Sequence, residues 1–267
     1  MAIRISMGQY VPGDSPIHRL DPRAKAVGTL LAMVAAIVAS EPAQLACCAA
    51  AVALLVGLCR VPPRRVLASV SSVLAFLAVI ALLNVFFVRG GAVLLSLGPV
   101  VVTEGGLWGA LLYAGRFALL VLVGAVLMLT TTPTQLTDAF ESLLSPLARL
   151  GAPVHDLAMV MSLALRFVPT LGEEAQQVLE AQAARGASFE SGGPAARLRA
   201  ALSVVVPLFA AALRHADAVA LALDARCYEG GASRSHFHEM RMRGADVAYL
   251  VAWFALLAAL VALGLVA

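Results

Sequence analysis

Residues 107–129 read LWGALLYAGRFALLVLVGAVLML, an apolar run in which Arg116 is the only charged side chain. A helix needs about 20 mostly apolar residues to cross the hydrocarbon core of a bilayer, so this run is predicted to span a membrane. The rest of the chain shares its character, because 61% of the 267 residues are hydrophobic and 13% are charged. Soluble domains carry roughly 25% charged residues, so the sequence predicts an all-α integral membrane protein.

Four other apolar stretches are long enough to cross a bilayer when helix tilt is allowed for. They lie at about 24–40, 43–59, 67–88 and 246–266. Only Glu41-Pro42 separates the first two, a spacing that is typical of a tight helical hairpin. We therefore expect about five transmembrane helices.

The segment 90–106 holds two short runs rich in β-branched residues on either side of Gly98-Pro99. Such runs favour a small β-hairpin, and an irregular cap over the helices fits the same residues.

The arginines predict the orientation of the chain, because short cytoplasmic loops are enriched in Lys and Arg. Basic residues gather before the first span, after the second span, and in the long stretch 131–245. The turn after the first span has none, and the loop after the third has only Arg89. A cytoplasmic N-terminus, five spans and an outer C-terminus in the cell (cytoplasmic) membrane satisfy all of these asymmetries. The chain then divides into a cytoplasmic segment 1–23, four transmembrane helices in 24–130, cytoplasmic or interfacial helices in 131–245, and a last transmembrane helix in 246–267.

The stretch 131–245 is expected to be cytoplasmic although it contains apolar pieces. Residues 133–151 place apolar side chains three and four positions apart, which predicts an amphipathic helix lying in the membrane interface. The apolar runs 157–165 and 200–213 are short for spans and favour buried or interfacial helices. If both crossed the bilayer, residues 169–199 would lie outside, and the sequence leaves that alternative open.

Two helical runs in this stretch, about 169–185 and 200–226, end on an arginine. The first closes on Ala184-Arg185-Gly186 and the second on Ala225-Arg226-Cys227. An arginine in a last turn interacts favourably with the helix dipole for about 0.3–1 kcal/mol, which explains one such end without any function. Two ends of the same kind also suit a role in binding, because an exposed guanidinium pairs well with a carboxylate on a partner.

The sequence offers little catalytic chemistry. Its only lysine, Lys25, is not preceded by the glycines of a phosphate-binding loop, so ATP hydrolysis would need a partner. Cys47, Cys48 and Cys59 lie in apolar stretches and are expected to act as small hydrophobic residues rather than as a site. His236 and His238 are two positions apart. A metal site formed by these two histidines is the less favoured alternative, and the favoured interpretation is that they bind no metal. The pair His155-Asp156 would suit a membrane-embedded transferase, but no nucleophile accompanies it.

Arg116 lies inside a predicted span, where a charge is costly and marks a functional hypothesis. Asn84, in the preceding span, is the nearest polar candidate to share its surroundings. A structural hydrogen bond explains Arg116 at least as well as contact with a substrate does.

The segment YVPGDSPIHRLDPRAK, residues 10–25, together with the two Ala-Arg helix ends, resembles the transmembrane T component of energy-coupling factor (ECF) transporters. The resemblance covers essentially the whole chain. It implies a non-catalytic scaffold with long coupling helices that cross each other and dock on two ABC-type ATPases, while the membrane part holds a substrate-binding S component. ATP hydrolysis by those subunits would drive uptake of a vitamin or micronutrient.

Carried over by the resemblance, the ATPase-binding residues are Ala184, Arg185, Gly186, Ala225, Arg226 and Cys227. Cys227 stands where the family motif has glycine. The expected partners are the two ATPases, S components and the lipid bilayer, with no nucleic acid, cofactor, catalytic residue or metal. A T component dedicated to cobalt or biotin remains an alternative, as does, less favoured, a membrane-embedded transferase.

Overall fold

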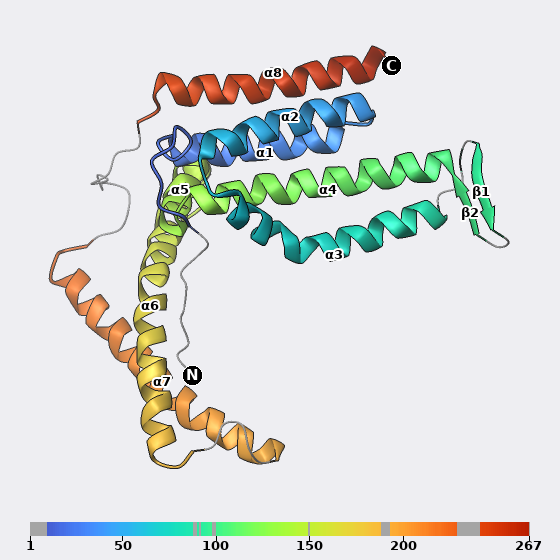
Figure 1. Cartoon of the computed structure of the whole chain (residues 1–267). Helices are drawn as coiled ribbons and strands as arrows, with labels where there is room; N and C mark the ends of the chain where they lie inside the picture. The colour runs from blue at the N-terminus through green and yellow to red at the C-terminus, as the bar shows by residue number, and fades with distance from the viewer. Residues whose placement is uncertain are drawn as a thin grey trace. The chain divides into compact units, whose positions relative to one another are not determined.

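The computed structural model describes residues 10–87, 90, 92–97, 100–148, 150–187, 193–228 and 241–266 (Figure 1). These residues form two compact units. One unit holds the described residues of 10–139 and 241–266, and the other holds those of 140–228.

The described residues form eight helices and one two-stranded sheet. In chain order the elements are α1 (Pro22–Val38), α2 (Pro42–Cys59), α3 (Pro63–Phe87), β1 (Val93–Leu97), β2 (Val100–Thr103), α4 (Glu104–Thr130), α5 (Pro133–Ala148), α6 (Val154–Ala184), α7 (Pro194–Asp224) and α8 (Gly244–Val266). Five of these helices begin on a proline, whose fixed φ suits the first turn and whose missing N–H would have no partner there. The protein is thus an all-α membrane protein with one small hairpin.

The first unit is a bundle of α1, α2, α3, α4 and α8, which lie side by side in Figure 1. Helix α1 supplies a face of buried alanines that packs on both α4 and α8. Small side chains let helix backbones approach closely, which is how helices associate where lipid removes the hydrophobic driving force. Larger core residues then close the bundle around them, among them Val52, Leu119, Val123, Trp253 and Leu260.

Each predicted span corresponds to one helix of this bundle. By length and composition, α2, α4 and α8 are able to cross a membrane. Helix α1 is shorter, at 17 residues, and α3 contains the apolar stretch Phe76–Val85.

The structure differs from the sequence-based expectation at α6 and α7. The apolar runs 157–165 and 200–213 belong to single helices of 31 residues each. Both helices are long and apolar enough to cross a membrane by length and composition. The apolar runs alone do not indicate the full length of these helices, because each helix continues beyond its apolar run into polar turns.

The predicted hairpin between the third and fourth spans is confirmed. Strands β1 and β2 pair antiparallel, with Leu97 opposite Val100 and Val93 opposite Thr103. Thr103 also caps α4, because its hydroxyl accepts a hydrogen bond from the Gly106 N–H at 3.2 Å.

Arg116 has a structural contact in the bundle. One guanidinium nitrogen donates to the Ala39 carbonyl at 2.6 Å, at the C-terminal end of α1, where positive charge is stabilised by the helix dipole. Asn84 donates to Ile80 of its own helix at 3.0 Å. The recorded bonds of the two side chains therefore go to separate acceptors.

Residues 10–21, which we call the N-terminal segment, are tied to the ends of three helices. The Val11 N–H donates to the Leu129 carbonyl at the end of α4 at 3.0 Å. His18 joins two parts of the segment, because its Nε2 lies 3.1 Å from the Val11 carbonyl and its Nδ1 lies 2.7 Å from Ser15 Oγ. Since a carbonyl only accepts, Nε2 carries the proton and the Ser15 hydroxyl donates to Nδ1.

Two buried charged side chains complete this attachment. Lys25 donates through Nζ to the carbonyls of His18 at 3.0 Å and Thr130 at 3.1 Å. The Asp246 carboxylate, 1% exposed, accepts the Asp21 N–H at 2.7 Å and the Arg243 N–H at 2.6 Å. Buried polar groups are costly unless bonded, so these contacts fix where the segment lies over α1, α4 and α8.

Helices α1 and α8 meet at a position where only glycine fits. A Cβ placed on Gly28 would overlap the Tyr249 ring, which itself packs edge-on against Trp253 with 6.4 Å between ring centroids. A Cβ placed on Gly57 in α2 would meet no neighbouring atom within 4 Å. The two glycines therefore form a matched pair for a packing test.

We expect Gly28→Ala to lower the stability of the bundle by about 1–3 kcal/mol, the usual cost of overpacking. Gly57→Ala should be neutral or stabilising by up to about 1 kcal/mol, because alanine favours helix and meets no neighbour there. Thermal unfolding of both purified variants in detergent measures the difference. Equal midpoints for the two variants would contradict the close α1–α8 contact.

Candidate functional site

The second unit contains α6 and α7, which contact each other and cross in Figure 1. Near the end of α6, the Gln182 amide donates to the Ser203 carbonyl of α7 at 3.3 Å. Closer to the middle of α6, Glu174 accepts a bond from His215 Nε2 at 2.7 Å, and the imidazole stacks on Phe167 at 5.7 Å between ring centroids. Residue numbers fall along α6 as they rise along α7, so the two helices run in opposite directions.

Both helices contain a proline and continue through it. Pro169 lies inside α6 and Pro207 lies inside α7. A proline removes one backbone donor and adds a clash with the preceding turn, but its φ is itself helical. The helices therefore begin earlier than expected, while their arginine ends fall where the sequence placed them.

The two arginine ends have the same backbone geometry. At the end of α6, the Gly186 N–H donates to Ala183 at 2.9 Å and the Ala187 N–H donates to Gln182 at 3.0 Å. At the end of α7, the equivalent bonds run from Cys227 to Asp224 at 2.9 Å and from Tyr228 to Leu223 at 3.1 Å. This pair of bonds defines the Schellman motif, in which the residue after the cap turns left-handed.

Arg185 and Arg226 occupy the same position of the motif, immediately before the left-handed residue. That residue has φ of 87° in Gly186 and 53° in Cys227. Cys227 thus adopts the conformation that glycine adopts in the first copy, and the substitution has not changed the turn. The backbone of Cys227 is strained, because an L-residue in the left-handed region costs roughly 1–2 kcal/mol.

All six residues predicted to bind the ATPases are exposed at these ends. They are Ala184, Arg185, Gly186, Ala225, Arg226 and Cys227. Because α6 and α7 run in opposite directions, the two ends lie at opposite ends of the helix pair. The structure therefore presents two similar, separate arginine tips and brings neither into contact with the other.

Other candidates have structural explanations within the described residues. The His155 ring donates through Nδ1 to Glu141 of α5 at 2.9 Å, so its bond goes to Glu141 and not to Asp156. Buried Cys48 and Cys59 pack in the bundle core, whereas Cys47 is exposed on α2. The described residues contain no group of three or more acidic, histidine or cysteine side chains placed to hold a metal, and His236 and His238 lie outside them.

Sequence reasoning missed two features of the structure. The first is the matched Schellman geometry, signalled by Ala-Arg at the same place in QAARGA (182–187) and LDARCY (223–228). The second is the buried Asp246, whose bonds hold the start of α8. Its position three residues after Arg243 is the available signal, because an acidic side chain at the third helical position reaches back to the cap N–H.

The strain at Cys227 can be tested by a reciprocal exchange. Cys227→Gly should stabilise the end of α7 by about 1 kcal/mol, and Gly186→Ala should destabilise the end of α6 by a similar amount. Amide hydrogen exchange of the last turn measures each effect, with slower exchange expected in the first variant and faster exchange in the second. Changes of the same sign in both variants would contradict the shared left-handed geometry.

Comparison with known proteins places the whole chain in one family. Residues 13–238 match the CbiQ family model, described as cobalt transport protein. The ECF transporter transmembrane protein EcfT of Thermanaerovibrio acidaminovorans is 44% identical over 89% of this chain and 88% of its own length. EcfT of Bacillus subtilis is 37% identical over 95% of this chain and 96% of its own length.

A third relative has a different size. A putative ABC transporter ATP-binding protein of Bifidobacterium longum is 46% identical over 94% of this chain, which spans only 32% of that protein's length. The other two relatives match over nearly their full lengths and carry the transmembrane name. The apolar bundle and the crossed helices fit that name, and the chain belongs to the family of ECF transporter transmembrane T components.

Proposed function

We propose that this T component couples two cytoplasmic ABC-type ATPases to S components that bind a vitamin or micronutrient. The observation that carries the proposal is the pair of exposed Schellman ends, which present Arg185 and Arg226 in the same backbone geometry. Two similar tips at opposite ends of a helix pair suit two similar receptors. A planar guanidinium favours a receptor with a carboxylate that it can bind through two bonds.

We assign ATP hydrolysis to the partners. The only lysine of the chain, Lys25, is buried and bonded to two backbone carbonyls, so it is committed to the bundle. The relative from Bifidobacterium longum is named as an ATP-binding protein and is about three times as long as its match to this chain. That name supports a link between this fold and an ATP-binding domain.

An exposed apolar stripe on α7 supports a membrane-embedded partner. Val205, Val206 and Phe209 are 55%, 63% and 64% exposed, and Leu202 and Leu213 continue the same face one turn on either side. The spacing is that of one face of an amphipathic helix. On a cytoplasmic helix, an apolar stripe of this size is expected to pack against a partner that shields it from water. An S component at the membrane surface would be such a partner.

The proposed topology follows the charge pattern. Helices α1, α2, α3, α4 and α8 would cross the cell membrane from a cytoplasmic N-terminus, and α5, α6 and α7 would lie on the cytoplasmic side. Helix α6 bears five polar side chains between 173 and 180 that are poorly suited to lipid, namely Glu173, Glu174, Gln176, Gln177 and Glu180. Placing α6 and α7 in the cytoplasm keeps these groups in water and keeps the two arginine ends beside soluble ATPases.

The coupling role predicts the effect of removing both tips. Arg185→Ala with Arg226→Ala should weaken ATPase association by 100-fold or more, because truncating one side of a buried charge pair costs about 2–5 kcal/mol. Substrate uptake should fall with it, while membrane insertion stays normal. Copurification of the ATPases and uptake by cells expressing the variant measure the two effects.

Arg214→Ala is the matched control, since Arg214 is an exposed arginine of α7 away from its end. It should copurify with the ATPases like the parent protein. If the double variant also binds ATPases and transports normally, the docking role of the two tips is wrong.

The orientation can be tested with a native thiol. Cys227 is exposed, so a membrane-impermeant maleimide should label it in inside-out vesicles and leave it unlabelled in intact cells or right-side-out vesicles. The Cys227→Ser variant cannot be labelled at position 227. Any labelling that remains in this variant therefore comes from Cys47. Labelling of Cys227 from the outside would place the end of α7 across the membrane and overturn the topology.

A further inference from the structure

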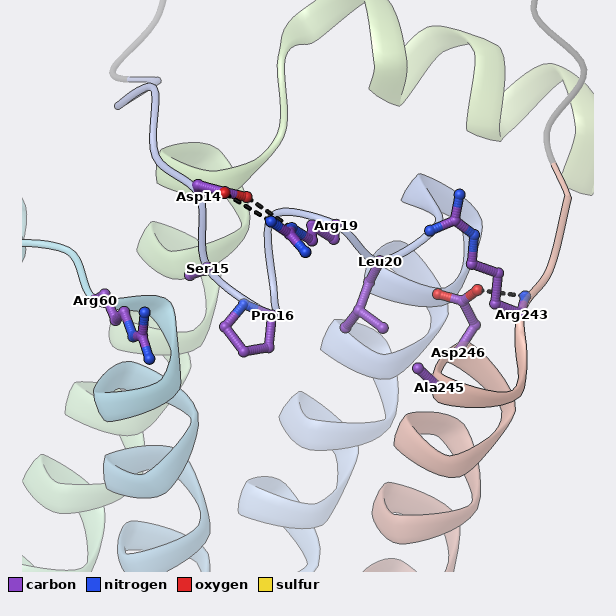
Figure 2. Close-up of a pocket in the computed structure, with 9 residues that line it drawn as sticks. All are labelled: Asp14, Ser15, Pro16, Arg19, Leu20, Arg60, Arg243, Ala245 and Asp246. Carbon is purple, nitrogen blue, oxygen red and sulfur yellow. Dashed lines mark hydrogen bonds and ion pairs between the residues drawn. The ribbon is translucent and has the colours of Figure 1, made fainter.

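Two cavities lie one after the other between α2, α8 and the N-terminal segment, all within the first unit. The first, of about 470 Å³, is lined by the charged ends of these elements, among them Arg19, Arg60 and Arg243 (Figure 2). The second, of about 300 Å³, is lined further along the same helices by apolar side chains, among them Ile17, Leu54 and Leu58. We call the first the head chamber and the second the tail groove.

The same three elements line both cavities in the same order. On α2, Arg60 borders the head chamber, and Leu58 and Leu54 border the tail groove. On α8, Asp246 borders the head chamber, and Trp253, two turns further along, borders the tail groove. The pair of cavities therefore changes from charged to apolar along the helix axes, as a membrane does from its surface to its interior.

The acidic groups of the head chamber already have partners. Asp14 accepts two bonds from the Arg19 guanidinium, at 2.6 and 2.7 Å, and this contact holds the pKa of Asp14 below its usual range. The Asp246 carboxylate is taken up by the N–H groups of Asp21 and Arg243. Both carboxylates are therefore already bonded, and Asp14 also interacts electrostatically with Arg60.

Arg60 and Arg243 supply the remaining positive charge. They extend from opposite sides of the chamber, one from the end of α2 and one from the start of α8, with Pro16 and Leu20 between them (Figure 2). Both are exposed, and the ion pairs recorded among the described residues include neither. Two guanidinium groups that line the same chamber suit an anionic head group with several oxygens, such as a phosphate diester.

We propose that an anionic glycerophospholipid binds here, with its phosphate between Arg60 and Arg243 and an acyl chain in the tail groove. Basic pockets between transmembrane helices on the cytoplasmic side are where anionic head groups bind. The head chamber alone falls within the range of about 300–1,000 Å³ that ligand pockets occupy. A free phosphate would leave the tail groove empty, and a partner helix would leave the two arginines unused.

This site involves no residue of α6 or α7, so it does not rest on the docking role of their ends. The bound lipid would join α2 to α8 across a face of the bundle where the N-terminal segment supplies the third wall. It would make the T component select anionic lipid over zwitterionic lipid of the same chain length.

The test is native mass spectrometry of the delipidated full-length chain in detergent, titrated with equal amounts of phosphatidylglycerol and phosphatidylcholine that share acyl chains. We expect preferential retention of phosphatidylglycerol. Arg60→Gln and Arg243→Gln should each lower its affinity about fivefold, since one basic residue near an anionic surface contributes about 1 kcal/mol. The double variant should bind the two lipids nearly equally.

Arg64→Gln is the matched control for charge, because Arg64 is an exposed arginine four positions from Arg60 that does not line the head chamber. It should keep the full preference. Thermal midpoints of all variants show that the fold is retained.

A second variant tests the tail groove without touching a charge. Leu54→Trp fills the groove and should lower the affinity for both lipids several-fold while their ratio is unchanged. Leu30→Trp, at an exposed apolar position of α1 outside the groove, should leave both affinities unchanged.

Three results would overturn the proposal. They are equal retention of the two lipids by the parent chain, full preference in the Arg60→Gln, Arg243→Gln double variant, and full lipid affinity in Leu54→Trp. Displacement of phosphatidylglycerol by an equal concentration of glycerol 3-phosphate would also overturn it, because the site would then recognise a free phosphate. If Leu54→Trp instead releases a bound membrane protein and no lipid, the groove is a protein interface.

Discussion

The membrane bundle depends on one buried carboxylate. Asp246 is almost inaccessible to solvent, and its two oxygens accept N–H bonds from Asp21, before α1, and from Arg243, before α8. An ionic group is costly to bury without partners, so this carboxylate holds the starts of the first and last helices at a fixed distance. The alanine face of α1, the Gly28–Tyr249 contact and the path of the N-terminal segment all follow from that alignment.

The two units are stabilised in different ways. The bundle buries apolar side chains from five helices around α1 and α4. The pair α6 and α7 is joined by polar contacts and one stacked histidine, and its large apolar side chains are mostly exposed. A helix pair with few buried side chains changes its crossing geometry at low cost in free energy, because little packed surface is lost. This difference suits the coupling role proposed above, in which soluble ATPases act on the membrane bundle.

The sequence predicted what depends on local composition. The spans follow from uninterrupted apolar runs, and the arginine ends follow from residues that stop a helix. The starts of α6 and α7 were predicted too late, at about 169 and 200, because the apolar pieces were too short to reveal the 31-residue helices around them. The bonds of Lys25 and Asp21 were beyond sequence reasoning, since their partners lie 105 and 225 positions away. The role of the six tip residues stays a prediction, and only the backbone bonds showed that Cys227 keeps the turn of Gly186.

The 225 positions between Asp21 and Asp246 also constrain how the protein is made. Chains are synthesised at about 5–20 residues per second, so the Asp21 N–H waits roughly 10–45 seconds before its acceptor exists. During that time α1 exists without α8, and its buried glycine and alanine face has no final neighbour. Helix α8 is thus the last element to join the bundle. A ribosome that stalls before residue 246 would leave an unsealed bundle, with the inner face of α1 open to lipid and to membrane proteases.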